Sequence, residues 1–136
     1  MPVVGFDHVA LPTQDAERCL AFYKRLGFAI LGEEAWRQGQ APTFAIQVGP
    51  QAKINIHPPG FVAPLRGETA RPGCGDLCFV WEGGLEALLA TLRRAGVAIL
   101  EGPVPRRGGR DGGRRRGRSV YLRDPDGNLL EFIVYE

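Results

Sequence analysis

An internal repeat is the feature that most constrains how this chain can fold. In the first copy His8 opens an expected strand and precedes Gly27 by 19 residues, and in the second copy Asp76 opens a strand and precedes Gly96 by 20 residues. The residues around the two glycines also match, LGFAI at 26–30 against AGVAI at 95–99. Similarity at a fixed period is typical of two like modules that each need the other to bury an apolar face.

The first copy predicts one helix and four strands. A helix capped by Thr13 or Asp15 runs to Leu26 and buries apolar residues spaced three and four apart. Gly27 then ends it. Runs rich in strand-forming residues lie at 6–11, 28–31, 43–48 and 53–57. The expected order is βαβββ.

The second copy predicts the same order again. Its elements are a strand at 76–81, a helix at 84–95, a strand at 97–100, and a hairpin of strands at 119–122 and 129–135. The stretch between the copies is rich in proline and glycine, which break regular structure. We therefore expect an α+β fold, with a first module at 1–60, a linker at 61–75 and a second module at 76–136, which together form one compact domain.

The closing hairpin carries an isolated charge. The turn at 124–128 reads DPDGN, in which proline and glycine favour a tight reversal. On the strand that follows, alternation places Leu130, Phe132 and Val134 on one face and Leu129, Glu131 and Ile133 on the other. Glu131 is the one charged residue among apolar neighbours, and an unpaired carboxylate is costly to desolvate.

Strand alternation also predicts partners for Glu131. If the bulky apolar residues of each strand pack toward the helices, the opposite face carries His8, His57, Asp76 and Glu131. These four residues include both histidines of the chain. Two imidazoles and one or two carboxylates suit Fe(II), Mn(II), Ni(II) or Zn(II). A lone strand histidine is more often a hydrogen-bonded core residue, but two on one face with Glu131 favour a site.

Composition places the chain among ordinary globular proteins. Apolar residues make up 44% and charged residues 24%, and no apolar run approaches the roughly 20 residues of a membrane-spanning helix. The N-terminus lacks the pattern of a secretory signal. The odd number of cysteines, Cys19, Cys74 and Cys78, predicts reduced thiols. We expect a cytoplasmic protein with no membrane partner.

The sequence resembles the vicinal oxygen chelate superfamily, which includes the glyoxalase I enzymes, extradiol dioxygenases and bleomycin-resistance proteins. The resemblance rests on DHVAL at 7–11, AFYKRLGF at 21–28 and DPDGNLLE at 124–131. It is similar to the glyoxalase-domain-containing subgroup through KINIH at 53–57, DLCF at 76–79 and EGPV at 101–104. The match spans nearly the whole chain.

The resemblance implies a half-open, mostly antiparallel barrel that holds a divalent metal, which substrates chelate through adjacent oxygens. By position, His8 is the ligand of the first strand and Glu131 the ligand and catalytic base of the last strand. His57 is taken as equivalent to Glu131 in the first module and is the natural fourth ligand. Asp76 stands where many members have histidine, so it either ligates directly or orients a ligating histidine.

The resemblance implies a metal-dependent lyase, isomerase or ring-cleaving dioxygenase. The alternative is a metal-free protein of the bleomycin-resistance type, which binds or sequesters a drug in its groove. Family members often complete their groove across a subunit interface, so we expect a homodimer. Candidates for substrate binding are Asn55, Cys78, Tyr121 and Arg118.

An arginine- and glycine-rich stretch concentrates the positive charge. Seven of the fifteen arginines lie between Arg106 and Arg118, against one acid, Asp111. We expect an irregular, mobile loop at 105–117, because these residues cannot build a core. It is interpreted as a solvated loop, as a lid that brings positive charge to an anionic substrate, or as a nonspecific nucleic-acid contact. Nucleic acid is the weakest interpretation, since no aromatic residues alternate with the arginines.

Overall fold

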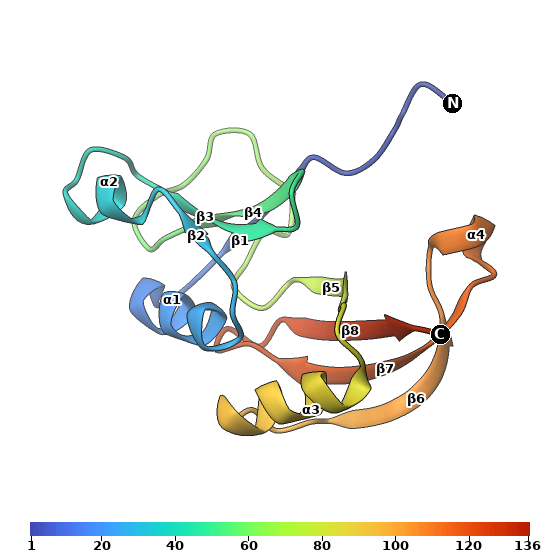
Figure 1. Cartoon of the computed structure of the whole chain (residues 1–136). Coiled ribbons are helices and arrows are strands. Elements are labelled where there is room, and N and C mark those ends of the chain that lie inside the picture. Colours follow the sequence, from blue (N-terminus) through green and yellow to red (C-terminus); the bar gives the residue numbers. More distant parts are fainter. The chain divides into compact units, whose positions relative to one another are not determined.

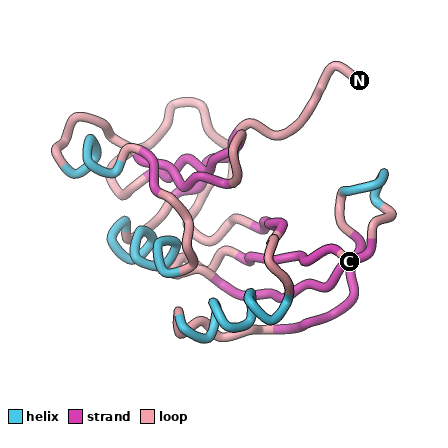
Figure 2. The backbone as a smooth tube through the Cα atoms, in the orientation of Figure 1, coloured by secondary structure: helices cyan, strands magenta, loops and turns pink.

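The chain folds into two compact units, Met1–Cys74 and Gly75–Glu136, in a computed structural model that describes all residues 1–136. The boundary falls at the end of the expected linker, and residues 58–75 form no helix or strand. Figures 1 and 2 show that each unit combines one open sheet with helices. The α+β class expected from the repeat is confirmed. None of the helices has the length and apolar character needed to span a lipid bilayer.

The first unit contains four strands and two helices in the order expected, with one helix added. They are β1 (His8–Pro12), α1 (Ala16–Arg25), β2 (Ile30–Leu31), α2 (Glu33–Arg37), β3 (Phe44–Val48) and β4 (Ala52–His57). The sheet order is β1-β4-β3-β2, in which β1 runs parallel to β4 and the other pairs are antiparallel. Since β1 and β2 occupy opposite edges, α1 carries the chain across the sheet.

Helix α1 begins and ends where its sequence provides caps. The Asp15 side chain accepts a hydrogen bond from the backbone N–H of Arg18 at 3.1 Å, which satisfies one of the free donors of the first turn. Of the two expected caps, Asp15 is the one used. Gly27 adopts a φ of +93° and its N–H donates to the carbonyl of Lys24, which ends the helix as expected. Cys19, Leu20 and Tyr23 are buried.

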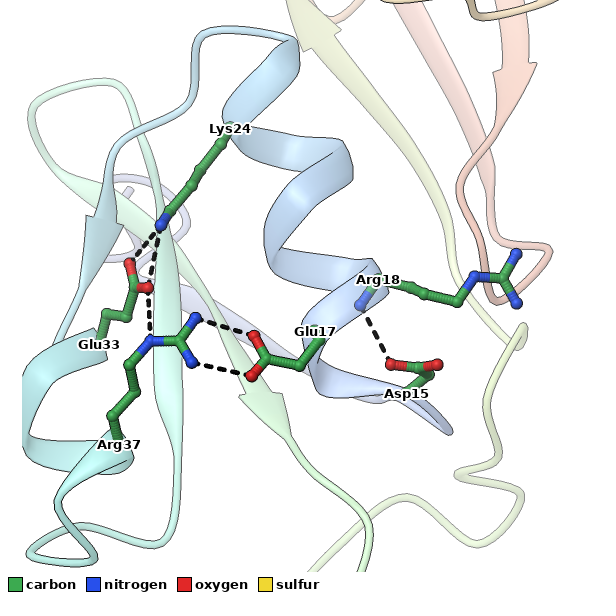
Figure 3. A network of polar contacts seen from close by, with 6 residues as sticks. All are labelled: Asp15, Glu17, Arg18, Lys24, Glu33 and Arg37. Atoms are coloured by element: carbon green, nitrogen blue, oxygen red, sulfur yellow. Dashed lines mark hydrogen bonds and ion pairs between the residues drawn. The ribbon is translucent and has the colours of Figure 1, made fainter.

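Surface ion pairs join α2 to α1 (Figure 3). The guanidinium of Arg37 donates two hydrogen bonds of 2.8 Å to the carboxylate of Glu17 and a third to Glu33, which also accepts from Lys24 at 2.9 Å. The hydrogen bond from Arg37 lowers the pKa of Glu17, and those from Lys24 and Arg37 lower the pKa of Glu33. This network holds the short α2, which the sequence pattern did not predict.

The second unit repeats the first, as the spacing of the two copies predicts. Its elements are β5 (Asp76–Val80), α3 (Leu85–Arg94), β6 (Glu101–Arg107), α4 (Arg110–Gly113), β7 (Arg116–Arg123) and β8 (Leu129–Tyr135). The sheet order is β5-β8-β7-β6, with β5 parallel to β8 and the other pairs antiparallel. Each sheet therefore has two antiparallel pairs and one parallel pair, and neither closes on itself.

The two faces of the second sheet differ in character, as the alternation of β8 predicts. One face carries large apolar side chains that are fully or nearly fully buried: Phe79, Val120, Leu122, Leu130 and Phe132. The rings of Phe79 and Phe132 lie 5.3 Å apart between centroids. The other face carries Cys78, Tyr121 and Glu131 in direct cross-strand register. Leu88 and Leu92 of α3 are also buried.

Two expectations about the second unit were wrong. Residues 97–100 form no strand, and β6 begins at Glu101 instead. The arginine-rich stretch is also not irregular throughout, because its two ends extend β6 and β7 into a longer hairpin whose tip includes the short turn α4 (Figure 1). Hydrogen bonding between the two strands orders a sequence that has no side chains able to form a core.

A β-bulge interrupts the pairing of β6 with β7. Glu101 lies opposite Tyr121 and Val104 lies opposite Ser119, so β6 has one residue more than β7 between these pairs. Gly102 sits in the bulge with a φ of +109°, and a Cβ atom there would overlap the backbone carbonyl of Ser119. Only glycine fits this close approach.

A buried hydrogen-bond network holds the turn between β7 and β8. The Asp124 carboxylate accepts from the backbone N–H groups of Asp126 and Asn128, each at 3.0 Å, and from the Asn128 side-chain amide at 2.7 Å. The side-chain oxygen of Asn128, Oδ1, accepts a hydrogen bond from the backbone N–H of Gly75, also at 2.7 Å. Asn128 is 2% exposed. The network therefore fixes both the turn and the start of β5.

We expect Asn128→Ala to lower the free energy of unfolding of the second unit by about 2–3 kcal/mol, because it leaves the Gly75 N–H and an Asp124 oxygen without this partner. Urea unfolding followed by circular dichroism measures the change. Asn55→Ala is the matched control, since Asn55 is half-buried on β4 and its side chain makes no hydrogen bond in the structure. Equal losses in the two variants would contradict the role of the network.

Candidate functional site

A row of four polar side chains crosses the second sheet on the face opposite its apolar core. Glu101 of β6, Tyr121 of β7, Glu131 of β8 and Cys78 of β5 are direct neighbours across successive strands. Residues paired in this way point to the same face, about 4.8 Å from one strand to the next. We call these residues the Glu131 row. Glu131, which the sequence shows as an isolated charge among apolar residues, therefore has polar neighbours on both adjacent strands.

Glu131 is oriented by a neutral donor rather than by a cation. Its Oε2 atom accepts a hydrogen bond of 2.6 Å from the hydroxyl of Ser119, which is fully buried on β7. Cys78 lies directly opposite Glu131 on the neighbouring strand β5. No lysine, arginine or histidine nitrogen lies within ion-pair distance of Glu131, although the residue is half-buried. The carboxylate is fixed in place, and its charge has no direct ion-pair partner.

Cys78 is held in its thiol form by its surroundings. Although part of its side chain is exposed, desolvation of the sulfur raises the pKa of Cys78 to about 12, and the negative charge of Glu131 contributes next. A thiol with this pKa is protonated at neutral pH and is a poor nucleophile. The thiol donates a weak hydrogen bond to the backbone carbonyl of Phe79, with the sulfur 3.9 Å from the oxygen.

Arg106 places a fixed positive charge at the other side of the row. Its Nε atom donates to the Tyr121 hydroxyl at 2.9 Å, and its guanidinium lies 5.4 Å from the centre of the Tyr121 ring. The hydrogen bond to Tyr121 raises the pKa of Arg106, with smaller contributions from the charges of Glu101 and Glu131. The closest carboxylate oxygen, that of Glu101, is 3.9 Å away. Arg106 is therefore held in place by the hydroxyl and the ring of Tyr121.

The first unit also has one polar sheet face. Register pairs His8 with Lys53, Ala10 with Asn55 and Pro12 with His57, so all of these lie on the same face of the β1–β4 pair. The His8 ring is about half exposed, and its Nδ1 atom is 2.6 Å from a carboxylate oxygen of Asp7. This contact leaves Nε2 available as a ligand atom.

Comparison of the two registers corrects the assumed equivalence of His57 and Glu131. On β8, Glu131 follows the cross-strand partner of Asp76 by two residues. On β4, the residue that follows the cross-strand partner of His8 by two is Asn55. At about 3.3 Å per residue and 4.8 Å between strands, the Cα atoms of His8 and Asn55 lie about 8 Å apart, and those of His8 and His57 about 14 Å. His57 is thus too distant to share a metal with His8, and its ring packs against Phe61 at 5.0 Å.

Each unit taken alone supplies two of the candidate ligand positions. These are His8 and Asn55 in the first unit, and Asp76 and Glu131 in the second. No three histidine, cysteine, aspartate or glutamate side chains are grouped in a way that would hold a metal within either unit. Of the donor types at the four positions, the imidazole and the two carboxylates are common ligands of divalent transition metals, whereas an amide carbonyl is a weaker ligand found mainly on hard cations.

The remaining predicted residues divide between the two faces of the second sheet. Asp76, Cys78 and Tyr121 share the face of Glu131, whereas Arg118 pairs with Val134 and lies on the opposite face. Alternation from Glu131 and Tyr121 also identifies Ser119 as a member of the same face. Arg106 was not identified from the sequence, because the bulge that places it there is not visible in the alternation pattern.

Comparison with known proteins gives consistent results. The family model described as the Glyoxalase/Bleomycin resistance protein/Dioxygenase superfamily matches residues 5–132. The chain is 32% identical over 136 residues to the Glyoxalase domain-containing protein RDO1 of Mycosarcoma maydis, which covers all of this chain and 71% of that protein. It is 33% identical to Virulence protein STM3117 of Salmonella typhimurium, with 99% of this chain and 87% of that protein covered.

Solved structures share the fold. The crystal structure of STM3117 superimposes with a TM-score of 0.85 over the full length of both chains. TnmS3, an antibiotic binding protein from Streptomyces sp. CB03234, has a TM-score of 0.69 at 21% identity, covering 100% of this chain and 99% of TnmS3. The identity to TnmS3 is too low to carry more than the fold.

We expect Cys78 to react with iodoacetamide at pH 8 at least about tenfold more slowly than the exposed Cys74, because so little of it is thiolate. Glu131→Gln should accelerate the reaction, since removing the carboxylate charge lowers the pKa of Cys78 and raises the thiolate fraction at a given pH. Glu101→Gln serves as the control. Peptide mass spectrometry over a pH series measures both rates, and a Cys78 rate unaffected by Glu131→Gln would contradict the coupling.

Proposed function

The chain belongs to the Glyoxalase/Bleomycin resistance protein/Dioxygenase superfamily, and from that premise we propose that it is a metal-dependent enzyme of the glyoxalase or dioxygenase type. Its substrate would be a small molecule that binds the metal through adjacent oxygens. The reaction would be an isomerisation, a lyase reaction or a ring-cleaving dioxygenation. Cytoplasmic location and a homodimer belong to the same proposal.

The observation that carries the proposal is the environment of Glu131. A half-buried carboxylate with no ion-pair partner is unfavourable unless a cation binds it. Ser119 donates a hydrogen bond to it from the neighbouring strand β7. Carboxylates that bind metals are usually oriented by hydrogen bonds of this kind. The geometry therefore supports a role for Glu131 as a metal ligand.

The proposed ligand set combines the two positions of each unit. His8 would bind through Nε2, Asp76 and Glu131 through carboxylate oxygens, and Asn55 through its amide carbonyl. Asn55 takes the place first given to His57, for the reason of register described above. Three oxygen donors and one imidazole suit Mn(II) or Fe(II) better than Zn(II). Once bound, the metal would supply Lewis acidity to a carbonyl or enediolate oxygen.

Glu131 is also the leading proton acceptor. Its carboxylate is held by the Ser119 hydroxyl at 2.6 Å, so it keeps one orientation while a substrate C–H or O–H approaches. The Cys78 thiol has a raised pKa and stays protonated beside Glu131, so it does not compete as a base. Tyr121, the other neighbour in the row, would line the substrate space.

The competing function is metal-free binding of a small molecule, in the manner of the bleomycin-resistance proteins. Asn55 favours it, because a neutral amide stands where the second unit has a carboxylate, and amides are weak ligands. In that case the polar face would bind the ligand by hydrogen bonds alone. Metal content separates the two functions.

We expect protein purified without added metal to contain close to one equivalent of Mn or Fe per chain, and Glu131→Gln to lose it together with turnover. Inductively coupled plasma mass spectrometry measures the content. Glu101→Gln is the matched control, since it removes a carboxylate from the same row. An unchanged metal content in Glu131→Gln, or the absence of metal binding after reconstitution with Mn(II) and Fe(II), would favour the metal-free function.

The register makes a separate prediction about the two histidines. We expect His8→Ala to weaken metal binding at least about tenfold, whereas His57→Ala should leave it unchanged because its ring lies too far from His8. Isothermal titration with Mn(II) measures both affinities. The two variants are matched in chemistry and in sheet face. Loss of metal in His57→Ala with retention in His8→Ala would reverse the assignment.

A further inference from the structure

A cavity of about 290 Å³ lies beside the tip of the β6–β7 hairpin. Its lining includes two arginines of the hairpin, the last residue of β8 and two residues that follow β5: Arg110, Arg115, Tyr135, Trp81 and Glu82. Tyr135 follows Glu131 by four residues on β8, which places the two Cα atoms about 13 Å apart along the strand. The cavity is therefore separate from the Glu131 row.

The side chain of Tyr135 is anchored to the hairpin. Its backbone pairs with Gly117 of β7. A Cβ atom on Gly108 would overlap the Tyr135 hydroxyl, so the hydroxyl occupies space that exists only because residue 108 is glycine. The hydroxyl oxygen also accepts a hydrogen bond of 3.5 Å from the backbone N–H of Arg110. The ring of Tyr135 is thus a fixed element in the wall of the cavity.

Tyr135 in turn positions two guanidinium groups. That of Arg110 lies 4.7 Å from the centre of the ring, and that of Arg115 lies 5.7 Å from it. Arg115 also donates a hydrogen bond of 2.8 Å from Nη2 to the main-chain oxygen of Glu136. Because both guanidinium groups already rest on one ring, little side-chain entropy is lost when they bind a third group.

No carboxylate side chain neutralises either guanidinium group. Neither Arg110 nor Arg115 has an ion pair with a side chain. Asp111, the one acid of the hairpin tip, pairs with Arg114 at 3.3 Å instead. Glu82 lines the same cavity but lies beyond ion-pair distance of both arginines. Two like charges near one ring repel each other, and an anion between them would turn this repulsion into attraction.

We propose that Arg110 and Arg115, supported by Tyr135, form a binding site for the phosphate or carboxylate group of a small molecule. Guanidinium groups bind such oxyanions through paired N–H donors. The guanidinium of Arg110 makes no hydrogen bond, and that of Arg115 uses only Nη2. The indole of Trp81 lines the space that remains for the rest of the molecule. The inference goes beyond the proposed function, since neither arginine belongs to the Glu131 row.

The cavity favours a small molecule over nucleic acid. Single strands are usually held by aromatic rings that stack on bases, and the ring of Tyr135 already contacts two guanidinium groups. The charge of Glu82 would also repel a chain of phosphates. A single compact anion can instead lie close to both arginines and away from Glu82.

Titration with inorganic phosphate and, separately, with acetate tests the site and distinguishes the two kinds of group. The indole N–H signal of Trp81 in NMR spectra reports binding, and that of Trp36 in the first unit is the internal reference. Sodium chloride at equal ionic strength is the salt control. We expect a saturable shift of the Trp81 signal with at least one of the two anions. Shifts no larger than those in sodium chloride for both anions would overturn the site.

Two arginine variants and a matched control locate the bound anion. Arg110→Gln and Arg115→Gln should each weaken its binding by about three- to tenfold. Arg107→Gln removes the same charge from the same hairpin but should leave the affinity unchanged, because Arg107 pairs with Arg116 and lines a different cavity. Equal weakening by Arg107→Gln would mean diffuse attraction and would overturn the site. A single-stranded oligonucleotide that binds more tightly than phosphate at physiological salt would overturn it as well.

Glu82 and Tyr135 provide two further tests. Glu82→Gln removes a negative charge from the cavity and should strengthen phosphate binding, so an unchanged or lower affinity would overturn the site. Tyr135→Phe keeps the ring and should weaken binding less than Tyr135→Leu, which removes the support of both guanidinium groups. Equal losses in the two tyrosine variants would contradict the role of the ring. Thermal melting followed by circular dichroism establishes that each variant is folded.

Discussion

The buried hydrogen bonds between Asp124, Asn128 and Gly75 fix the register on which the candidate site depends. They close the turn between β7 and β8 and attach the start of β5 to the same point. Once these three strands begin in register, the pairing places Glu131 between Tyr121 and Cys78 with no freedom to shift by one residue. A shift of one residue would turn Glu131 into the apolar face, where its charge could not be solvated. The turn sequence is thus as important for the site as the residues of the site themselves.

The β-bulge in β6 places Arg106 on a sheet face that regular strand pairing would not give it. A regular β6 would carry Glu101 toward the polar face and turn Arg106 away from it. With Gly102 in the bulge, the guanidinium of Arg106 comes to lie over the ring of Tyr121. Backbone geometry at one glycine therefore sets the electrostatic character of the face.

The parts predicted from the sequence are those that follow from periodicity. The repeat gave two βαβββ units, helix periodicity gave the buried residues of α1, and alternation gave the face of Glu131. The failures come from interactions that are not local in sequence. The pairing of β1 with β4 determines that Asn55, rather than His57, matches Glu131, and no property of the segment KINIH reveals it. Likewise α2 is held by Arg37 reaching Glu17, a contact 20 residues apart. The metal and the reaction stay predictions.

The asymmetry of the two repeats bears on how such a site would be charged. At equivalent positions the first unit presents an imidazole and an amide, and the second presents two carboxylates without ion-pair partners. Arg106 is held by the Tyr121 hydroxyl and makes no ion pair with Glu131. An imidazole and an amide supply no negative charge, so the negative charge of any cation site has to come from Asp76 and Glu131. The chemistry of the second unit therefore decides whether a divalent cation can be held.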